Sequence, residues 1–249
     1  MLKHKCLSIL FLLLFLIGCA TERPVGKTEA EILYKEAKDL IADQRYLLAT
    51  ERLNTIRQQY PYSFYATHAE LMQADILFMQ ENFVESAASY ILFKDFHPKH
   101  KKLSYVLLRI ADSFYYQLPD TYDRDLAPGH EAIKYYQELT RIFRKSKHVK
   151  EANKRIIEIK TMIRKKEQYI ADFYYKTEVF DSARFRYLNI LKTFKKKSLR
   201  DHSMIRVLES SASLEKPKEC ASFYRKYKRK VTSKNMEKLK SAYLSCKKL

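Results

Sequence analysis

Glycine is scarce in this sequence: three glycines occur in 249 residues, and only Gly26 and Gly129 lie beyond the amino-terminal apolar segment. Turn-rich β proteins need many backbone positions with positive φ and usually place glycine there. Alanine, leucine, lysine and glutamate, which are good helix formers, are plentiful instead. The composition therefore predicts an all-α protein.

Catalytic motifs are also missing. The sequence has no glycine-rich phosphate loop, no Gly-x-Ser-x-Gly elbow and no His-Glu-x-x-His pair. His97 and His100 lie close together, but no cysteine or clustered carboxylate accompanies them as metal ligands would. Asp123 and Asp125 flank Arg124, and a local ion pair or helix cap explains them better than acid–base catalysis. We expect a protein that is not an enzyme and binds no metal or cofactor.

The one long apolar run lies at the amino terminus. Lys3 and Lys5 make a positive start, and residues 7–17 are apolar except for Ser8. This run is too short to cross a bilayer stably, which needs about 20 apolar residues. A positive start followed by a short apolar run is typical of a secretory signal peptide. We predict that residues 1–18 are such a signal peptide.

The run ends in Leu16-Ile17-Gly18-Cys19, which resembles the lipobox of bacterial lipoproteins, where a small residue precedes the lipid-bearing cysteine. We predict that Cys19 is acylated and that residues 19–28 form a lipidated tether. Ala20 stands where many lipoproteins of the inner membrane have aspartate, so we expect retention at the outer membrane. One lipid chain anchors weakly, whereas three hold a protein firmly.

Acidic residues are outnumbered by basic ones, 29 to 48, and the formal net charge is +19 at pH 7. Such an excess favours anionic partners. The export signal puts nucleic acid out of reach, so anionic lipid headgroups, lipopolysaccharide and acidic proteins remain. The alternative is a solvated, lysine-rich surface without a partner.

Two cysteines follow Cys19, namely Cys220 and Cys246. Exported proteins meet an oxidising compartment, where this pair could form a disulfide between the last two helices. Because the sequence provides no Cα–Cα distance, two free thiols remain open as the alternative.

A repeat of 37 residues organises the chain. Its pattern is an aromatic residue, a small residue, two large apolar residues and a proline at the helix end. The two fullest copies are Tyr46, Ala49, Leu53, Ile56, Tyr60 and Pro61, followed by Phe83, Ser86, Tyr90, Phe93, His97 and Pro98. Degenerate copies follow around Ala132, Ala183 and Cys220.

Each copy follows an earlier amphipathic segment, so the repeating unit is a helix hairpin with a close crossing at the small residue. The proline ends the second helix because it lacks an N–H. This period resembles the tetratricopeptide repeat, whose stacked hairpins bury a continuous core. We predict an all-α, tetratricopeptide-like helix-hairpin solenoid of about five repeats over residues 29–249, with amino-terminal repeats at 29–145 and carboxy-terminal repeats at 146–249. A single conventional helix bundle is the alternative.

Two segments depart from the repeat. Residues 117–129 lengthen the loop of the third hairpin, where Pro119, Pro128 and Gly129 oppose a continuous helix. Long loops in compact repeats are often functional. Residues 148–177 form one unusually long helical pattern with a basic face.

Four segments resemble the BamD family, the lipoproteins of the outer-membrane β-barrel assembly machinery. They are Gln59-Tyr60-Pro61-Tyr62-Ser63-Phe64-Tyr65-Ala66, Phe96-His97-Pro98-Lys99-His100, Asp123-Arg124-Asp125 with the His130 that follows, and the run over residues 166–175. Ser63 and Phe64 depart from the Gly-Pro of the family. The resemblance covers about residues 29–195 and is thin beyond residue 199.

The resemblance implies a non-catalytic scaffold, lipid-anchored on the periplasmic face of the outer membrane. Its implied partners are a BamA-like barrel subunit, other assembly lipoproteins and unfolded outer-membrane proteins, with no nucleic acid. Arg186 stands where the family has an arginine that contacts the barrel subunit. The alternative class is a tetratricopeptide envelope lipoprotein that acts as an adaptor for peptidoglycan or cell-division enzymes.

A substrate-peptide site is expected on the amino-terminal half, near Tyr62, Phe64 and Tyr65. These aromatic residues follow Pro61 and begin the connection into the next hairpin. Leu71, Gln73 and Asp75 on the next helix are possible neighbours of the site. The alternative is that all three aromatic residues only hold adjacent repeats together.

Replacing Cys19 tests the lipid anchor. Cys19→Ala removes the thiol that accepts the lipid, so incorporation of labelled palmitate is expected to fall to background. Cys6→Ala, which removes the cysteine just before the apolar run, serves as the control and is expected to keep normal labelling. Unchanged labelling of Cys19→Ala would show that the lipobox is misassigned.

Overall fold

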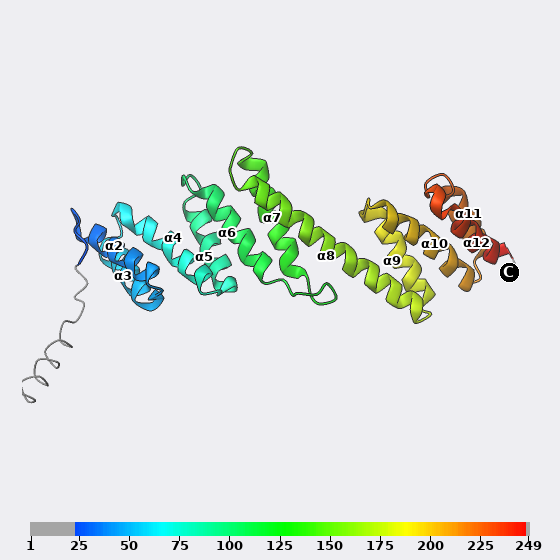
Figure 1. Cartoon of the computed structure of the whole chain (residues 1–249), viewed down its shortest axis with the longest axis horizontal. Helices are drawn as coiled ribbons and strands as arrows, with labels where there is room; N and C mark the ends of the chain where they lie inside the picture. Colours follow the sequence, from blue (N-terminus) through cyan, green and yellow to red (C-terminus); the bar gives the residue numbers. More distant parts are fainter. Residues whose placement is uncertain (1–22, 248–249) are drawn as a thin grey trace, which may run out of the picture. The chain divides into compact units, whose positions relative to one another are not determined.

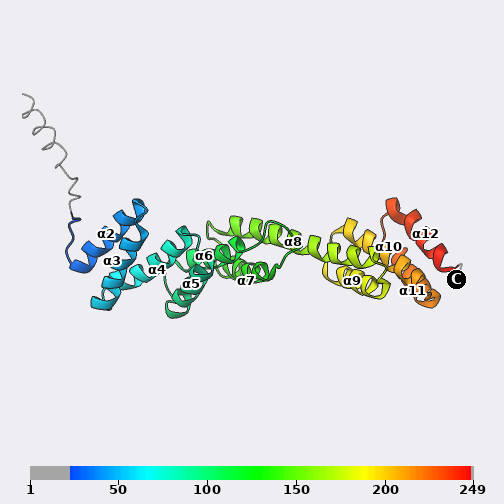
Figure 2. The ribbon, with the colours of Figure 1, turned by 90° about the horizontal axis from the view of Figure 1, so that it is seen from below.

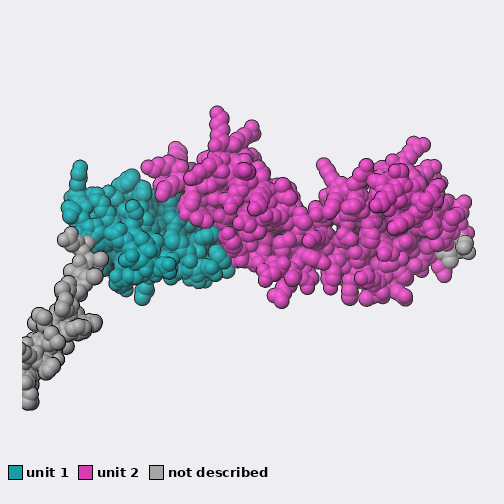
Figure 3. Space-filling model, in the orientation of Figure 1, with its two compact units in different colours: residues 1–96 teal, residues 97–249 magenta. Residues whose placement is uncertain are grey.

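The computed structural model describes residues 23–247, which form α-helices joined by short loops. The chain divides into two compact units, residues 1–96 and residues 97–249 (Figure 3). The described part contains no β-strand, and consecutive helices pair as hairpins, so the predicted all-α, tetratricopeptide-like hairpin fold is confirmed.

In the first unit, residues 23–96 form two helix hairpins (Figure 1). The first hairpin pairs α2 (Glu29–Ala42) with α3 (Tyr46–Gln59), and the second pairs α4 (Phe64–Met79) with α5 (Phe83–Phe96). Helix α3 packs against α4, so the hairpins share a core.

In the second unit, α8 links successive hairpins. The elements of residues 97–247 are α6 (Leu103–Tyr116), α7 (Ala127–Ile142), α8 (Val149–Lys176), α9 (Phe180–Thr193), α10 (Lys197–Ser213), α11 (Pro217–Tyr227), the 3₁₀ helix η1 (Ser233–Asn235) and α12 (Met236–Lys247). The 28-residue α8 packs against α7 and then against α9, as both ribbon views show (Figure 1, Figure 2). Helices α10, α11 and α12 pack against one another at the carboxy-terminal end of the unit.

A pair of buried residues marks the crossing in each hairpin. The pairs are Ala37 with Ala49, Ala74 with Ser86, Ala111 with Ala132, Ala171 with Ala183, and Leu208 with Cys220. All ten residues are inaccessible to solvent, and in four hairpins both members are small. Small side chains let the two helix backbones approach closely, and the burial of these residues agrees with the predicted role of the small repeat position.

Tight turns join the helices in four of the hairpins without glycine. Gln44, Glu81, Glu178 and Glu215 have φ values of 59°, 61°, 62° and 53°. Each ends its helix in a Schellman motif: the Arg45 N–H, for example, donates to the Leu40 oxygen at 2.8 Å. The low glycine content thus does not reflect a lack of left-handed positions, because glutamine and glutamate occupy them here.

A tyrosine on the second helix of three hairpins donates a hydrogen bond to an aspartate on the first helix. The pairs are Tyr90 with Asp75 at 2.5 Å, Tyr136 with Asp112 at 2.6 Å, and Tyr187 with Asp172 at 2.5 Å. All three tyrosines are fully buried, so the hydroxyl needs this partner. The large apolar repeat position therefore also links the two helices through a polar contact.

The acidity of the paired aspartates depends on their surroundings. Burial raises the pKa of Asp112 above its ordinary value, even though Tyr136 hydrogen-bonds the carboxylate. Burial acts in the same direction on Asp172, but hydrogen bonds from His202 and Tyr187 outweigh it and lower the pKa. Asp172 is thus held as a carboxylate at the junction of α8, α9 and α10.

The predicted long loop is shorter than expected. Helix α7 begins at Ala127, so Pro128 and Gly129 lie in its first turn, where proline is well tolerated. A Cβ added at Gly129 would lie 2.8 Å from Ile159 Cγ2, which shows how closely α7 approaches α8. The loop itself spans residues 117–126, and the Asp125 carboxylate accepts the Ala127 N–H at 3.0 Å.

Removing one tyrosine hydroxyl tests the polar link. Tyr187→Phe leaves Asp172 with one fewer donor, and we expect the free energy of unfolding at pH 7 to fall by about 1–2 kcal/mol in urea titrations. Tyr174→Phe is the control, since the Tyr174 hydroxyl has no hydrogen bond within residues 23–247, and its effect is expected to stay within about 0.5 kcal/mol. Equal effects of the two substitutions would contradict the role of the pair.

Candidate partner and substrate surfaces

The residues just before α2 are tied to that helix. Cys19 itself lies outside the described residues. The Arg23 guanidinium pairs with Glu29 and Glu36, and the Lys35 ammonium donates to the Val25 carbonyl oxygen at 2.7 Å. The end of the predicted tether, at residues 23–28, therefore runs along the surface of the first hairpin.

Two of the three predicted substrate-binding aromatic residues are open to solvent. Tyr62 is fully exposed, and Phe64 is 66% exposed, with its ring 4.1 Å from the His68 ring. Tyr65 is half-buried and packs on Tyr34 at a centroid distance of 5.3 Å. Only Tyr65 therefore contributes clearly to hairpin packing, while Tyr62 and Phe64 present aromatic surface at the start of α4.

The three expected neighbours on α4 take part in internal packing. Leu71 is buried, and Asp75 accepts the Tyr90 hydroxyl. Gln73 bridges to α3, where it donates to Asn54 at 2.7 Å and accepts from Arg57 at 2.7 Å. The accessible aromatic surface is therefore confined to the amino-terminal end of α4.

Arg186 lies at the rim of the second unit on α9. Its side chain is 38% exposed, and within residues 23–247 its one ion-pair partner is Glu167, with Nη1 3.7 Å from Oε2. Arg184, two residues earlier, is largely buried and pairs with Glu219 at 2.6 Å and Asp181 at 3.5 Å. Arg186 thus keeps donors available for a partner, whereas Arg184 fastens α11 to α9.

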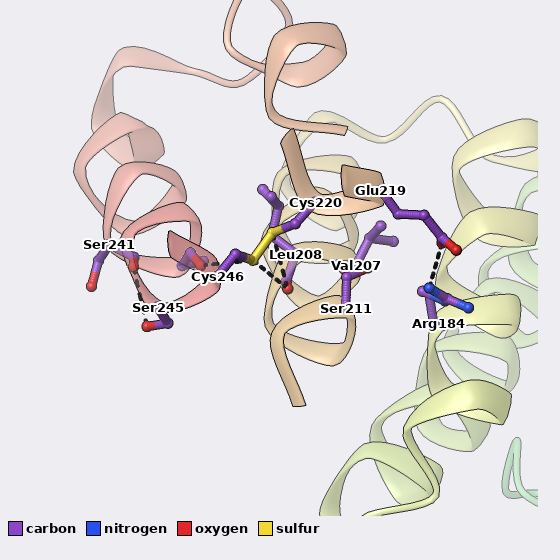
Figure 4. The surroundings of a disulfide bond; sticks show 10 residues. Arg184, Val207, Leu208, Ser211, Glu219, Cys220, Ser241, Ser245 and Cys246 are labelled. Carbon is purple, nitrogen blue, oxygen red and sulfur yellow. Dashed lines mark hydrogen bonds and ion pairs between the residues drawn. A yellow bond between two sulfur atoms is a disulfide. The ribbon is translucent and has the colours of Figure 1, made fainter. Parts of the chain in front are cut away.

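Cys220 and Cys246 form a disulfide that joins α11 to α12, with a Cα–Cα distance of 6.3 Å. Figure 4 shows the bond against Leu208 of α10, with the Arg184–Glu219 ion pair nearby. The sequence left open a disulfide or two free thiols, and the structure has the disulfide.

A buried carboxylate holds the connection between α11 and α12. Asp201 accepts hydrogen bonds from the Thr232 hydroxyl at 2.5 Å and from the Asn235 amide at 2.9 Å. The disulfide and Asp201 together anchor the last helix of the second unit to α10 and α11.

In the basic runs near the carboxy terminus, the aromatic side chains pack inward and the basic side chains lie in solvent. Tyr224 stacks on Tyr243 at 4.2 Å, and Tyr227 is buried. Lysines 195–197 and the basic residues around Tyr227 are exposed. The aromatic residues of these runs are therefore structural, and the charge forms the surface.

The described residues contain no group of three or more histidine, cysteine or acidic side chains that could hold a metal ion. None of the helices within residues 23–247 combines the length and apolar character needed to span a membrane.

The hairpin architecture defines a repeat protein of the tetratricopeptide class. Residues 27–225 match the family described as "YfiO: Outer membrane lipoprotein", and the chain belongs to this family. The predicted resemblance to BamD proteins is confirmed by this match and by the relatives below.

Two curated relatives carry the name "Outer membrane protein assembly factor BamD". The protein of Vibrio cholerae is 25% identical over 203 residues, which cover 78% of this chain and 84% of the relative. The protein of Rickettsia prowazekii is 25% identical over 209 residues, which cover 83% of each chain.

Two solved tetratricopeptide structures also align with the chain. The TPR2AB domain of yeast Sti1, in its pHSP90 complex, has 12% identity and a TM-score of 0.46, and the alignment covers 89% of this chain and 84% of that domain. A tetratricopeptide repeat protein of Parabacteroides merdae has 11% identity and a TM-score of 0.29, with 88% and 98% covered.

Proposed function

We propose that this protein is a non-catalytic scaffold lipoprotein of the outer-membrane β-barrel assembly complex. The observation that carries the proposal is the family match over residues 27–225, together with relatives that are named as outer-membrane protein assembly factors. Lipid on Cys19 holds the chain on the periplasmic face of the outer membrane. The hairpins then present their surfaces to proteins in the periplasm.

The arrangement of the hairpins suits a scaffold. Stacked hairpins bury their apolar faces against their neighbours and leave extended surfaces for binding. Two surfaces of different chemistry are open within the described residues: aromatic side chains at the start of α4 and a guanidinium on α9. Each surface offers a contact to a separate protein.

Arg186 is the residue that we assign to the BamA-like barrel subunit. A guanidinium can give two parallel hydrogen bonds to one carboxylate, and such contacts are both strong and directional. The internal partner, Glu167, is distant at 3.7 Å and easily replaced by a carboxylate of another protein. An exposed pair of this kind contributes little to the fold itself.

Tyr62, Phe64 and Tyr65 form the proposed contact for unfolded barrel proteins. Exposed aromatic rings offer large contact area at little loss of conformational entropy, and they can pack against aromatic residues of an extended chain. Tyr65 supports the site from the hairpin core, while Tyr62 and Phe64 face solvent.

Charge reversal at Arg186 tests the scaffold role. Arg186→Glu is expected to release the barrel subunit from affinity-purified, detergent-solubilised complexes, because losing a desolvated charge pair at an interface costs about 2–5 kcal/mol. Lys192→Glu makes the same charge change at an exposed position of the same helix, and it is expected to keep the subunit bound.

Mass spectrometry of the wild-type purification identifies the partners directly. Recovery of peptidoglycan or cell-division enzymes in place of barrel-assembly proteins would overturn the proposed function. Retention of the barrel subunit by Arg186→Glu would remove the role of this residue alone.

Photocrosslinking tests the substrate site. Photoreactive residues at positions 62 and 64 are expected to crosslink a peptide that ends in an aromatic residue, because both side chains reach solvent. The same photoreactive residue placed at position 47, which is exposed on α3, is the control, and its crosslinking yield is expected to stay at background. The photoreactive residue is also placed at exposed positions within residues 146–249, and crosslinks confined to those positions would reject the site.

A further inference from the structure

A groove of about 480 Å³ lies along α8 in the second unit. One wall is Tyr122, from the loop between α6 and α7, and the base is a single face of α8. The α8 residues that line it lie on one face of the helix, mostly at spacings of three and four, and are Lys165, Gln168, Tyr169, Asp172, Phe173 and Lys176. Neither Arg186 nor the aromatic residues of α4 belong to it, so it is a third surface.

The extra loop of the third hairpin is held in place as the wall of this groove. The Lys166 ammonium donates to the Arg124 carbonyl oxygen at 2.5 Å. The Tyr122 ring meets the Tyr169 ring edge-on at 6.1 Å, and the Lys165 ammonium lies 5.8 Å from the Tyr122 ring centre. Contacts from one end of the groove therefore fix the position of the loop.

The middle of the groove is aromatic and open. Tyr169 and Phe173 are 50% and 53% exposed, although both are large rings on a well-packed helix. Burying such rings against a ligand is favourable by roughly 25 cal/mol for each Å² of apolar surface removed from water. The adjacent Asp172 carboxylate is already hydrogen-bonded by Tyr187 at 2.5 Å and His202 at 2.7 Å.

The two ends of the groove are positive. Lys165 and Lys176 are eleven residues apart on α8, a span of about 16 Å at a rise of about 1.5 Å per residue. An extended peptide advances by about 3.3 Å per residue, so about five residues cover this span. Positive ends and an aromatic middle complement a short segment with acidic residues around a central aromatic one.

We propose that the groove formed by Tyr122, Tyr169 and Phe173 between Lys165 and Lys176 binds an extended peptide segment with a central aromatic residue and flanking acidic residues. A linear ligand fits because the rings lie between the two charges, and because Tyr122 rises beside them as a wall. The inference rests on the groove alone and not on the proposed assembly role.

Fluorescence anisotropy of a labelled Ser-Glu-Ala-Phe-Ala-Glu-Ser peptide, with the full mature chain in detergent, measures this binding. Lys165→Glu combined with Lys176→Glu is expected to raise the Kd at least about tenfold, because two attractive contacts become repulsive. Lys150→Glu combined with Lys160→Glu is the matched control: both lysines are exposed on α8 outside the groove, and the Kd is expected to stay within about twofold.

Substitutions of an aromatic residue in the groove and of residues in the peptide test the proposed binding independently of the two lysines. Phe173→Ser is expected to weaken binding several-fold, as is replacement of the peptide phenylalanine by serine. Replacing both peptide glutamates by glutamine is expected to weaken binding and to reduce its dependence on salt.

Three results would overturn the proposal. The first is an unchanged Kd in the Lys165→Glu, Lys176→Glu protein with a native circular dichroism spectrum. The second is an equal loss of affinity in the matched control, which would indicate binding to net charge alone. The third is the absence of saturable peptide binding while phosphatidylglycerol vesicles bind the chain through Lys165 and Lys176, which would make the groove a lipid-binding surface.

Discussion

The close crossing of two helices within each hairpin is the constraint on which the rest of the structure depends. The crossing residues are twelve positions apart in four hairpins, as for Ala37 with Ala49 and Ala171 with Ala183. A separation this short leaves room only for a tight Schellman turn, which explains why Gln44 and Glu178 accept left-handed backbone conformations. The crossing also brings an aspartate and a tyrosine together, because they follow the small residues by one and four positions.

The groove along α8 lies where the repeat is interrupted. In the third hairpin the crossing residues Ala111 and Ala132 are nine positions further apart than elsewhere, yet the crossing and the Tyr136–Asp112 hydrogen bond persist. The extra residues therefore form a loop outside the hairpin core. Helix α8, which extends past α7 to pack on α9, supplies the base on which this loop rests. The groove exists because two departures from the repeat meet there.

Whether a charged side chain is available to a partner depends on its position in the fold. Arg184 and Arg186 are two residues apart on α9. The Arg184 guanidinium already forms ion pairs with Asp181 and Glu219, whereas Arg186 forms one ion pair with Glu167, at the longer distance of 3.7 Å. The lysines near the carboxy terminus are solvated around buried tyrosines. The positive charge of the described residues is therefore divided among separate surfaces, and Lys165, Lys176 and Arg186 are the cations that we propose for acidic partners.

The sequence by itself determined the helical class, the hairpin repeat, the small crossing positions, the long α8 and the family. Most of these properties depend on local propensity and on periodic burial. The 37-residue spacing of corresponding positions, as between Ala49 and Ser86 or between Ala183 and Cys220, can be counted in the sequence. The scarcity of glycine did not exclude left-handed backbone positions, because a Schellman turn accepts glutamate at Glu81 and Glu215 when the flanking helices hold it.

Only the tertiary structure decided which polar groups meet. The Cys220–Cys246 disulfide joins residues 26 positions apart, and the contact of Lys166 with the loop at Arg124 joins residues 42 positions apart. The repeat spacing encodes neither contact. The structure also separated Tyr65, which is half-buried and packs against the core of the first unit, from Tyr62 and Phe64, which are exposed. Adjacent residues on a helix point in different directions, so their exposure depends on the neighbouring helices that cover them.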